Sequence, residues 1–390
     1  MTTSVDRIVV LGSGLAGWTT VRELRKLAPD LPVTVVTADA GDFYAKPSLS
    51  NAFAQGRQPQ QLVGSTAVKM AETLGVTLLQ RTRASVIDCA GHVLVTDQGP
   101  VPYSKLVLAT GAQPIRVPLE GDGADAVRSV NSLDDFAAFH AELRPGARVA
   151  IMGAGLIGCE FANDLAGAGF QVSVVDPSTR PLAALLPEAA SEALRAALQA
   201  LGVQWHFGTT VRSLHRQRDA LQLQLADGGS FEADVVLSAV GLRADIALAR
   251  AAGLVCDRGI VVDSALATTE PDIFALGDCA QYGTGSWAVA PVAGGDTLPY
   301  VLPIMSAAKV LAARLAGGRD TLRFALMPIS IKTPALPLVV ASPALASTGQ
   351  WYAPEEGLWH FIDAGGVARG FVLAGKQTSR RAELARLLAV

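Results

Sequence analysis

The chain has 390 residues, of which 50% are hydrophobic and 17% are charged. This length exceeds what a single hydrophobic core usually supports, so we expect two or three domains, and the composition excludes a largely disordered chain. The formal net charge of -3 gives no electrostatic reason to expect nucleic acid as a partner, because such binding needs a concentrated basic face.

The four cysteines lie far apart and form neither a CxxC pair nor a metal-binding group: Cys89, Cys159, Cys256 and Cys279. This pattern favours a reduced, cytoplasmic protein without a metal site. The first strand is expected near Arg7, which leaves no room for a signal peptide. Residues 333–354 carry no charge but contain several prolines, so we expect neither a spanning helix nor a membrane anchor. The oligomeric state stays open, with a monomer favoured.

A short apolar strand at residues 9–11 runs directly into a glycine-rich turn. The turn has the spacing G-x-G-x-x-G, with Gly12, Gly14 and Gly17. In such a turn the first glycine bends the chain, the second lets a pyrophosphate approach bare backbone, and the third lets the next helix pack close to its strand. Apolar periodicity then predicts a helix over residues 15–27 and a second parallel strand over 33–36. This unit predicts a dinucleotide site, with the phosphates at the helix N-terminus.

The same order of elements occurs a second time. Strand-like segments lead to a buried strand and glycine turn at residues 103–111. A new strand at 148–152 then enters a second G-x-G-x-x-G turn at 153–158, followed by a helix and a strand at 172–176. A strand at residues 235–241 ends the second copy on a glycine, in the same way that residues 103–111 end the first copy. The chain is therefore predicted to contain two dinucleotide-binding modules.

The pattern changes after the second copy. We expect strands at residues 260–263 and 272–280, the second of which ends on an exposed acid. A loop rich in glycine and proline follows at 282–299, and a helix at 304–315. Residues 323–390 alternate strand patterns and end in an amphipathic helix, which predicts a third, smaller domain.

Two nucleotide modules together with Thr110-Gly111 and Gly277-Asp278 resemble the FAD-dependent pyridine nucleotide oxidoreductases, over nearly the whole chain. The resemblance implies an α/β fold with two Rossmann-like, glutathione-reductase-like domains and a small α+β C-terminal domain. The implied limits are 1–114 with 246–322 for the FAD domain, 115–245 for the NAD(H) domain and 323–390 for a C-terminal interface domain.

The resemblance also implies which residues contact the two cofactors. For FAD they are Gly12, Gly14, Leu15, Ala16, Gly17, Thr37, Asp39, Lys46, Pro47, Thr110, Gly111, Asp278 and Lys332. For NADH they are Gly153, Gly155, Ile157, Gly158, Glu160, Asp176 and Gly241. Asp278 would bind the ribityl chain of FAD, the alternative being a simple turn cap. Family members usually end the second strand on an acid that binds the adenosine ribose. Thr37 stands there instead, which leaves that contact to a backbone group or to Asp39.

Three shorter segments resemble the rubredoxin reductases and their relatives that reduce flavorubredoxin. They are Thr37-Ala38-Asp39, residues 44–50 and Ile331-Lys332-Thr333-Pro334. This resemblance implies that Lys46 and Pro47 lie beside the isoalloxazine ring and that Lys332 enters from the third domain near the pyrimidine side. Each lysine has the alternative of being a solvated surface charge.

The second module indicates which nicotinamide coenzyme binds. Asp176 ends its second strand, where a carboxylate accepts hydrogen bonds from ribose hydroxyls and repels a 2′-phosphate. NADH is therefore expected over NADPH, although Arg180 is near enough along the loop to reach a phosphate.

Glu160 begins the helix after the second glycine turn, where it complements the helix dipole if it has no other role. In related ferredoxin reductases this glutamate pairs with a lysine at the position of Asn51. An ion pair here must therefore use another partner, either Lys46 or Lys332. Lys46, Glu160 and Lys332 are the candidate catalytic residues.

No cysteine occupies the positions that disulfide reductases, thioredoxin reductases or NADH peroxidases use, so electrons should leave the flavin directly. The expected activity is NADH:rubredoxin oxidoreductase, with a hydride passing to flavin N5 and two single electrons to the rubredoxin iron. The positive end of a helix that starts at Pro303, together with Lys332, would stabilise charge near flavin N1. The partner would be rubredoxin or a similar small acidic redox protein. Alternatives are a ferredoxin or flavorubredoxin reductase serving an oxygenase, a P450 or nitric oxide reduction, and a flavin-binding redox sensor.

Overall fold

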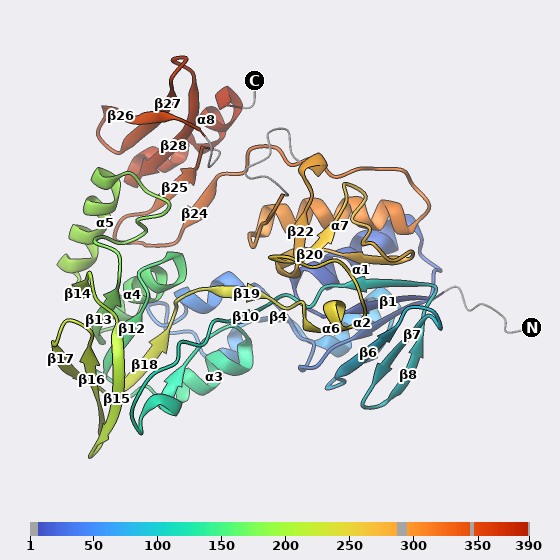
Figure 1. Cartoon of the computed structure of the whole chain (residues 1–390), viewed down its shortest axis with the longest axis horizontal. Helices are drawn as coiled ribbons and strands as arrows, with labels where there is room; N and C mark the ends of the chain where they lie inside the picture. The colour runs from blue at the N-terminus through green and yellow to red at the C-terminus, as the bar shows by residue number, and fades with distance from the viewer. Residues whose placement is uncertain (1–6, 287–294, 344–346, 389–390) are drawn as a thin grey trace, which may run out of the picture.

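The computed structural model describes residues 7–286, 295–343 and 347–388, and its three layered units are shown in Figure 1. The first unit is built on a parallel sheet of five strands in the order β21-β9-β1-β2-β5. These strands are β1 (Ile8–Leu11), β2 (Val33–Val36), β5 (Thr77–Leu79), β9 (Lys105–Leu108) and β21 (Ile273–Ala275). The central strands are buried on both faces, which explains their continuous apolar sequence.

Helices and a small second sheet cover this parallel sheet. The helices are α1 (Leu15–Leu27), α2 (Ala67–Leu74) and α7 (Val301–Leu315), together with the short α6 (Ala247–Ala251). The antiparallel strands β6 (Ala84–Asp88), β7 (Val93–Thr96) and β8 (Gly99–Pro102) add Ile87, Leu94 and Val101 to the same core. A ribbon of β3 (Phe43–Tyr44) and β4 (Val63–Ser65) carries the 3₁₀ turn Lys46–Asn51.

The second unit repeats the plan of the first. Its parallel sheet has the order β11-β18-β12-β13-β14, so that β18-β12-β13-β14 matches β9-β1-β2-β5 strand for strand. The strands are β11 (Val127–Arg128), β12 (Arg148–Met152), β13 (Gln171–Asp176), β14 (Gln204–Phe207) and β18 (Val235–Ser238). The other elements are α3 (Leu133–Glu142), α4 (Leu156–Gly167), α5 (Glu188–Ala200), β15 (Val211–Gln217), β16 (Ala220–Leu225) and β17 (Ser230–Ala233). The prediction of two Rossmann-like modules is confirmed.

A two-stranded antiparallel ribbon connects the modules. It pairs β10 (Ala112–Pro114), where the chain leaves the first module, with β19 (Leu242–Ala244), where it returns. The return is completed by β21, which joins the first sheet beside β9.

The single strand expected over residues 272–280 is wrong. The chain forms β21, then a 3₁₀ turn at Gly277–Cys279, then β22 (Ala280–Tyr282), which pairs with β20 (Ile260–Val262) and β23 (Asp296–Thr297). Gly277 has a φ of +82°, a left-handed conformation that interrupts an extended strand. Asp278 therefore lies in the turn between two sheets. Much of the loop expected at 282–299, residues 287–294, lies outside the described residues.

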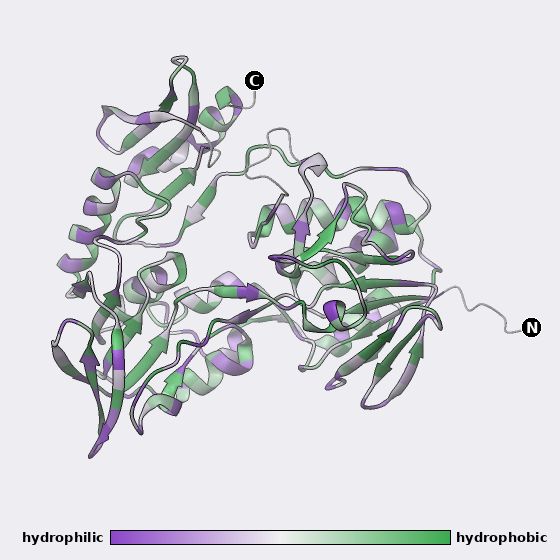
Figure 2. Ribbon diagram, viewed as in Figure 1, coloured by the Kyte–Doolittle hydropathy of each residue, from purple (hydrophilic) through white to green (hydrophobic). Residues whose placement is uncertain are grey.

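The third unit is an antiparallel sheet in the order β24-β25-β28-β27-β26, with α8 (Arg381–Leu388). Its strands are β24 (Ile329–Ile331), β25 (Leu338–Ala341), β26 (Gly349–Glu355), β27 (Leu358–Asp363) and β28 (Ala368–Ala374). Because successive strand residues point to opposite faces, Val339 packs toward Leu384 of α8 whereas Val340 joins the core of the second module, with Phe161 and Leu165. The third unit thus shares a hydrophobic core with the second (Figures 1 and 2).

The sheets do not define exact domain limits, so the boundaries proposed at residues 114, 245 and 322 stay predictions. None of the described helices is long and apolar enough to cross a membrane. The four cysteines are free.

Candidate functional site

The glycines of the first turn differ in what surrounds them. Gly12 has a φ of +113°, and a Cβ there would lie 2.2 Å from the carbonyl oxygen of Ala109. A Cβ on Gly17 would lie 1.9 Å from the oxygen of Gly12. By contrast, no atom lies within 4 Å of a Cβ built on Gly14. Gly14 is the N-cap residue of α1, and no side chain forms a capping hydrogen bond there. Gly12 and Gly17 are therefore required by packing, whereas Gly14 leaves open backbone at a helix N-terminus, which suits a phosphate.

The second turn has the same geometry. Gly153 has a φ of +103°, and a Cβ on Gly158 would lie 1.9 Å from the oxygen of Gly153. Gly155 again has no atom within 4 Å of the built Cβ. Ile157, two residues further on, is 39% exposed despite being apolar. Both turns therefore present an open glycine to a ligand.

The ends of the second strands are chemically different in the two modules. The amide of Gly12 donates to Val36 O and that of Gly153 to Val175 O, so Thr37 and Asp176 occupy equivalent positions. Asp176 accepts hydrogen bonds from the amides of Ala154 at 2.6 Å and Ser178 at 2.7 Å. Its carboxylate is thus fixed beside the glycine turn, as expected for a ribose-binding acid.

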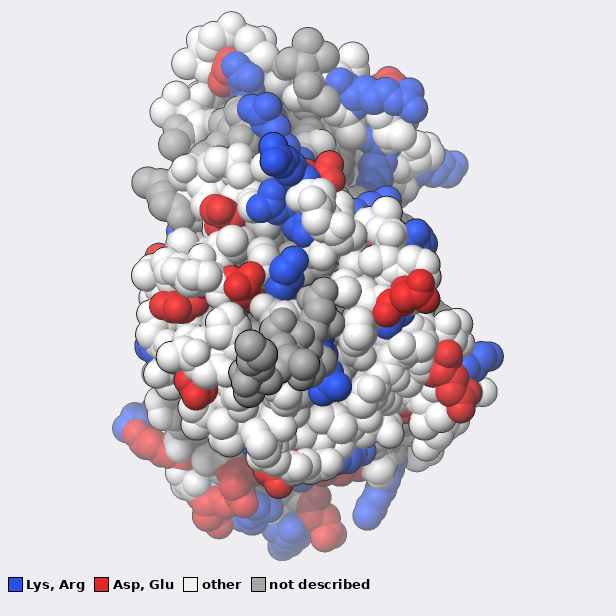
Figure 3. All heavy atoms as spheres, turned by 90° about the vertical axis from the view of Figure 1, so that its right-hand side faces the viewer, with Lys and Arg blue, Asp and Glu red and all other residues white. Residues whose placement is uncertain are grey.

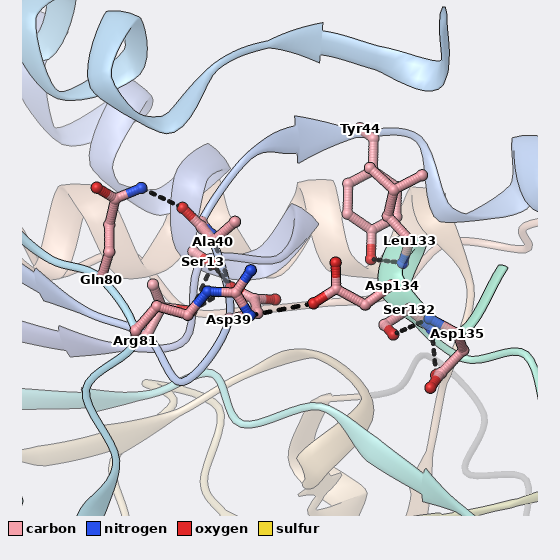
Figure 4. Close-up of polar contacts among 12 residues, drawn as sticks. Ser13, Asp39, Ala40, Tyr44, Gln80, Arg81, Ser132, Leu133, Asp134 and Asp135 are labelled. Atoms are coloured by element: carbon pink, nitrogen blue, oxygen red, sulfur yellow. Dashed lines mark hydrogen bonds and ion pairs between the residues drawn. The ribbon is translucent and has the colours of Figure 1, made fainter. Parts of the chain in front are cut away.

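The Nε atom of Arg180, on the loop after Asp176, is buried without a hydrogen-bond partner among the described residues. Thr37, at the equivalent strand end in the first module, is buried and donates a hydrogen bond to the carboxylate of Asp39. Figure 4 shows Asp39 beside Ser13 of the first glycine turn, with which it also shares a hydrogen bond.

The opposite charges of Asp278 and Lys46 influence each other in the first unit. Burial raises the pKa of Asp278, and the positive charge of Lys46 opposes that rise. Burial likewise lowers the pKa of Lys46, and the Asp278 carboxylate opposes this. The Oδ1 atom of Asp278 is buried with no hydrogen-bond donor among the described residues. Because an unsatisfied buried carboxylate oxygen is costly, a ligand with hydroxyl groups fits this position.

Thr110, Gly111 and Gly241 shape the connections between the modules. Thr110 Oγ1 donates to Asp245 O at 2.9 Å, and the amide of Asp245 donates to Gly111 O at 3.0 Å. Gly111 and Gly241 have φ values of +73° and +119°, which favour glycine. These contacts explain the glycines through the fold and give no ligand contact by themselves.

Glu160 of α4 joins all three units. Its side chain is 1% exposed, and Lys332 Nζ lies 2.7 Å from Glu160 Oε2. The Lys332 amide donates to Glu160 Oε1 at 2.9 Å, and Ser50 Oγ donates to Oε2 at 2.6 Å. Lys332 Nζ also donates to Pro47 O and to Ser50 Oγ. Of the two lysines considered as partners for Glu160, the structure selects Lys332 and not Lys46.

Two further polar residues of α4 were missed from the sequence. Asp164 accepts hydrogen bonds from the amides of Phe53 and Ala54, both at 2.9 Å, and Asn163 Oδ1 accepts one from Ala335 N at 3.0 Å. Burial raises the pKa of Asp164, and the backbone donors oppose the rise. The available signal was the three- and four-residue spacing from Glu160, which places all three polar groups on one face of an otherwise apolar helix.

Tyr44 and Arg81 of the first unit contact the start of α3 in the second (Figure 4). Tyr44 Oη accepts a hydrogen bond from the amide of Leu133 at 3.1 Å, and Arg81 lies 3.2 Å from Asp134. Burial raises the pKa of Tyr44 to about 12. These two contacts connect the first module to the start of α3 in the second module.

Comparison with known proteins agrees with this architecture. Residues 6–295 match the model of the pyridine nucleotide-disulphide oxidoreductase family, and residues 321–388 match a rubredoxin binding C-terminal domain. The chain is 43% identical to a rubredoxin-NAD(+) reductase of Alcanivorax borkumensis, over 97% of both chains. It is 41% identical to the protein of the same name from Acinetobacter baylyi, over 96% of this chain and 95% of that one.

More distant relatives extend the comparison. A nitric oxide reductase FlRd-NAD(+) reductase of Aeromonas hydrophila is 37% identical over 98% of this chain and 96% of its own. Among solved structures, the putidaredoxin reductase–putidaredoxin complex superposes with a TM-score of 0.88 over 99% of this chain and 94% of that chain, at 22% identity, which shows a common fold. The two glycine turns, the shared sheet order and the family match over residues 6–295 lead to one assignment. The chain belongs to the pyridine nucleotide-disulphide oxidoreductase family.

Proposed function

We propose that this protein is an NADH-dependent, FAD-containing reductase that passes electrons to rubredoxin. The observation that carries the proposal is identity of 41–43%, over nearly the full chain, to proteins named rubredoxin-NAD(+) reductase. The match of residues 321–388 to a rubredoxin binding domain supports the same acceptor.

FAD fits the first module on two structural grounds. Gly14 leaves open backbone at the N-terminus of α1 for the pyrophosphate, and the unsatisfied Oδ1 of Asp278 would accept a ribityl hydroxyl. Lys46 and Pro47 would lie beside the flavin ring. When bound, FAD supplies the conversion of a two-electron donor into single-electron steps.

NADH fits the second module because of Asp176. Its carboxylate, fixed by the amides of Ala154 and Ser178, would accept ribose hydroxyls and repel a 2′-phosphate. Gly155 would admit the pyrophosphate to the N-terminus of α4. Glu160 lies on the first turns of that helix and would orient the nicotinamide side of the site through its contacts with Lys332 and Ser50.

The Glu160–Lys332 pair gives the third unit a part in the site. Lys332 contacts Pro47 O and Ser50 of the first unit as well as Glu160 of the second. One side chain from the acceptor-binding end of the chain therefore holds the loop that would flank the flavin and the helix that would bind NADH. We assign Lys332 the role of keeping these groups in register.

The cysteines support direct electron transfer without a thiol relay. Cys159 and Cys279 are buried, and burial raises the pKa of both thiols, which keeps them protonated and unreactive. Cys89 and Cys256 are free and only partly buried, and burial raises the pKa of these thiols too. Four free cysteines also suit the reducing conditions of the cytoplasm.

A small acidic redox protein fits one face of the molecule. Lys and Arg side chains form a band from the top of this face to about its middle, with Asp and Glu mostly to its sides (Figure 3). Such a band would attract an acidic partner and increase the association rate at low ionic strength, despite the net charge of -3.

A second candidate acceptor is the rubredoxin-type protein that serves nitric oxide reductases, because relatives with 37% identity are named FlRd-NAD(+) reductases. The test is to add NADH to the purified flavoprotein with rubredoxin, flavorubredoxin, ferredoxin and oxygen in parallel. We expect rubredoxin to be reduced fastest. Faster reduction of flavorubredoxin would select the second candidate, and equal rates with ferredoxin or oxygen would reject both. Failure to oxidise NADH with any acceptor would favour the redox-sensor alternative.

A further inference from the structure

One face of α4 carries three buried polar side chains, and the proposed function uses only the first of them. Glu160, Asn163 and Asp164 are 1%, 3% and 2% exposed. Their three- and four-residue spacing makes them neighbours on the helix surface. Because α4 starts at the second glycine turn, a segment that bonds to this face is positioned relative to the helix that would bind NADH.

The first unit meets this face at two points of a single segment. Ser50 Oγ donates to Glu160 Oε2 at 2.6 Å, near the end of the 3₁₀ turn Lys46–Asn51 that would flank the flavin. Further along the chain, the amide of Phe53 donates to Asp164 Oδ2 and the amide of Ala54 donates to Asp164 Oδ1, both at 2.9 Å. Each carboxylate oxygen of Asp164 thus holds one backbone amide, which fixes the orientation of the segment as well as its position.

Apolar packing holds the same segment against the second unit. Leu49 and Ala52 are buried in the hydrophobic core of that unit, and Phe53 packs against this core. A Cβ built on Gly167, at the end of α4, would lie 3.5 Å from the Cβ of Ala54. The segment belongs to the first unit by its place in the chain, but α4 of the second unit positions it.

We propose that Asp164 is a positioning residue for hydride transfer, because it sets where the flavin-flanking turn lies relative to α4. The step is the transfer of a hydride, with both of its electrons, from the dihydronicotinamide to flavin N5, which leaves NAD⁺. Asp164 acts on this step only through the backbone of residues 53 and 54. Displacement of reacting groups by about 1 Å can slow such a step about 100-fold. The inference rests on the proposed function, since it takes FAD and NADH as the cofactors.

Hydrogen exchange tests the positioning without any turnover. In Asp164→Asn an NH₂ group replaces one carboxylate oxygen and faces a backbone N–H, so one of the two hydrogen bonds is lost. We expect the amides of Phe53 and Ala54 to exchange about 10- to 100-fold faster, the range for a hydrogen bond to a charged group. Asp234→Asn is the matched control, since Asp234 accepts a hydrogen bond from the amide of Arg148 at the start of β12, the end remote from the glycine turn.

Stopped-flow reduction of the holoprotein by NADH separates the chemical step from binding. We expect the limiting rate of flavin reduction in Asp164→Asn to fall about 10- to 100-fold. The dissociation constant of NADH should be unchanged, because Gly155 and Asp176 keep their contacts. NADH deuterated at the transferred position should lower the rate further, which identifies the slow step as hydride transfer. Asp234→Asn should match wild type in both quantities.

Gly167 gives a second way to displace the same segment without altering Asp164. Gly167→Ala makes only an ordinary contact with Ala54, whereas the two further methyl groups of Gly167→Val press on Ala54 and should move the segment away from α4. Gly167 is exposed, so either variant should fold. We expect slower flavin reduction in Gly167→Val and the wild-type rate in Gly167→Ala.

The inference is supported if Asp164→Asn shows faster exchange at residues 53 and 54 together with slower flavin reduction at unchanged NADH affinity. It is overturned if the limiting rate stays at the wild-type value, if rate and NADH affinity fall together, or if the rate falls without a change in exchange. If Asp164→Asn does not fold, the Gly167 variants decide, and equal rates in the two overturn the inference. If the wild-type protein binds no flavin or is not reduced by NADH, the proposed function fails instead.

Discussion

Replacing Lys332 by methionine should destabilise the protein more than replacing its partner Glu160 by glutamine. Removal of one member of a buried ion pair costs about 3–5 kcal/mol of unfolding free energy when the other charge is left alone. In Lys332→Met, the buried Glu160 side chain, which is 1% exposed, keeps hydrogen bonds only from Ser50 and from the amide of residue 332. We therefore expect the unfolding free energy to fall by about 2–3 kcal/mol. In Glu160→Gln, the Lys332 ammonium that remains is on a side chain 33% exposed and can be hydrated. We therefore expect the unfolding free energy to fall by only about 1–2 kcal/mol.

The measurement is urea unfolding of the holoprotein, followed by circular dichroism and by release of flavin fluorescence. Free energies are taken only if the two transitions coincide, because multidomain proteins often unfold in steps. Lys309→Met, at an exposed position on α7, is the control for loss of a lysine. The double variant should be less destabilised than the sum of the single variants, by about 1 kcal/mol. An additive cycle, or a greater loss in Glu160→Gln than in Lys332→Met, would show that the pair does not join the units as described.

The remaining predictions concern the glycine turn, the coenzyme and alkaline pH. Gly14→Ala should fold but lose FAD in gel filtration, whereas Gly17→Ala should give little soluble protein. The reason is that a Cβ on residue 17 collides with backbone, whereas a Cβ on residue 14 does not. Equal yields of folded protein from the two variants would contradict this. Asp176→Ala should lower kcat/KM for NADH about 10- to 100-fold, through loss of charged hydrogen bonds, and leave NADPH little changed; parallel losses with both coenzymes would argue against a ribose contact. The pKa of Tyr44 rises from 10.0 to about 12 on folding, so its contribution to stability is present below pH 10 and is lost as pH rises toward 12. Unfolding at pH 8 and pH 11 should therefore show a smaller alkaline loss in Tyr44→Phe than in wild type or in the exposed control Tyr352→Phe.

Local sequence patterns are sufficient to predict the two nucleotide modules. Each rests on a strand, a glycine turn and a helix that follow one another within about 20 residues, and close packing at Gly12 and Gly153 leaves few alternatives to glycine. The difference between Thr37 and Asp176 was likewise visible, because both are located by counting from their turns.

Other features required the tertiary structure. The strand expected over 272–280 is divided because Gly277 adopts a left-handed φ and the two halves join different sheets, which hydrophobic pattern does not reveal. The position of Asp39 depends on a turn that brings its oxygen to Ser13 and Thr37.

The partner of Glu160 was decided only by the packing of the third unit. Lys332 is 172 residues away from Glu160 in the chain. From the sequence, Lys46 was an equally reasonable partner. The choice follows from a hydrophobic core shared by the second and third units, which brings β24 against α4 and places the lysine at a buried carboxylate. Local spacing predicts elements because neighbouring residues are constrained by backbone geometry, whereas contacts between distant residues depend on which apolar faces the whole chain buries together.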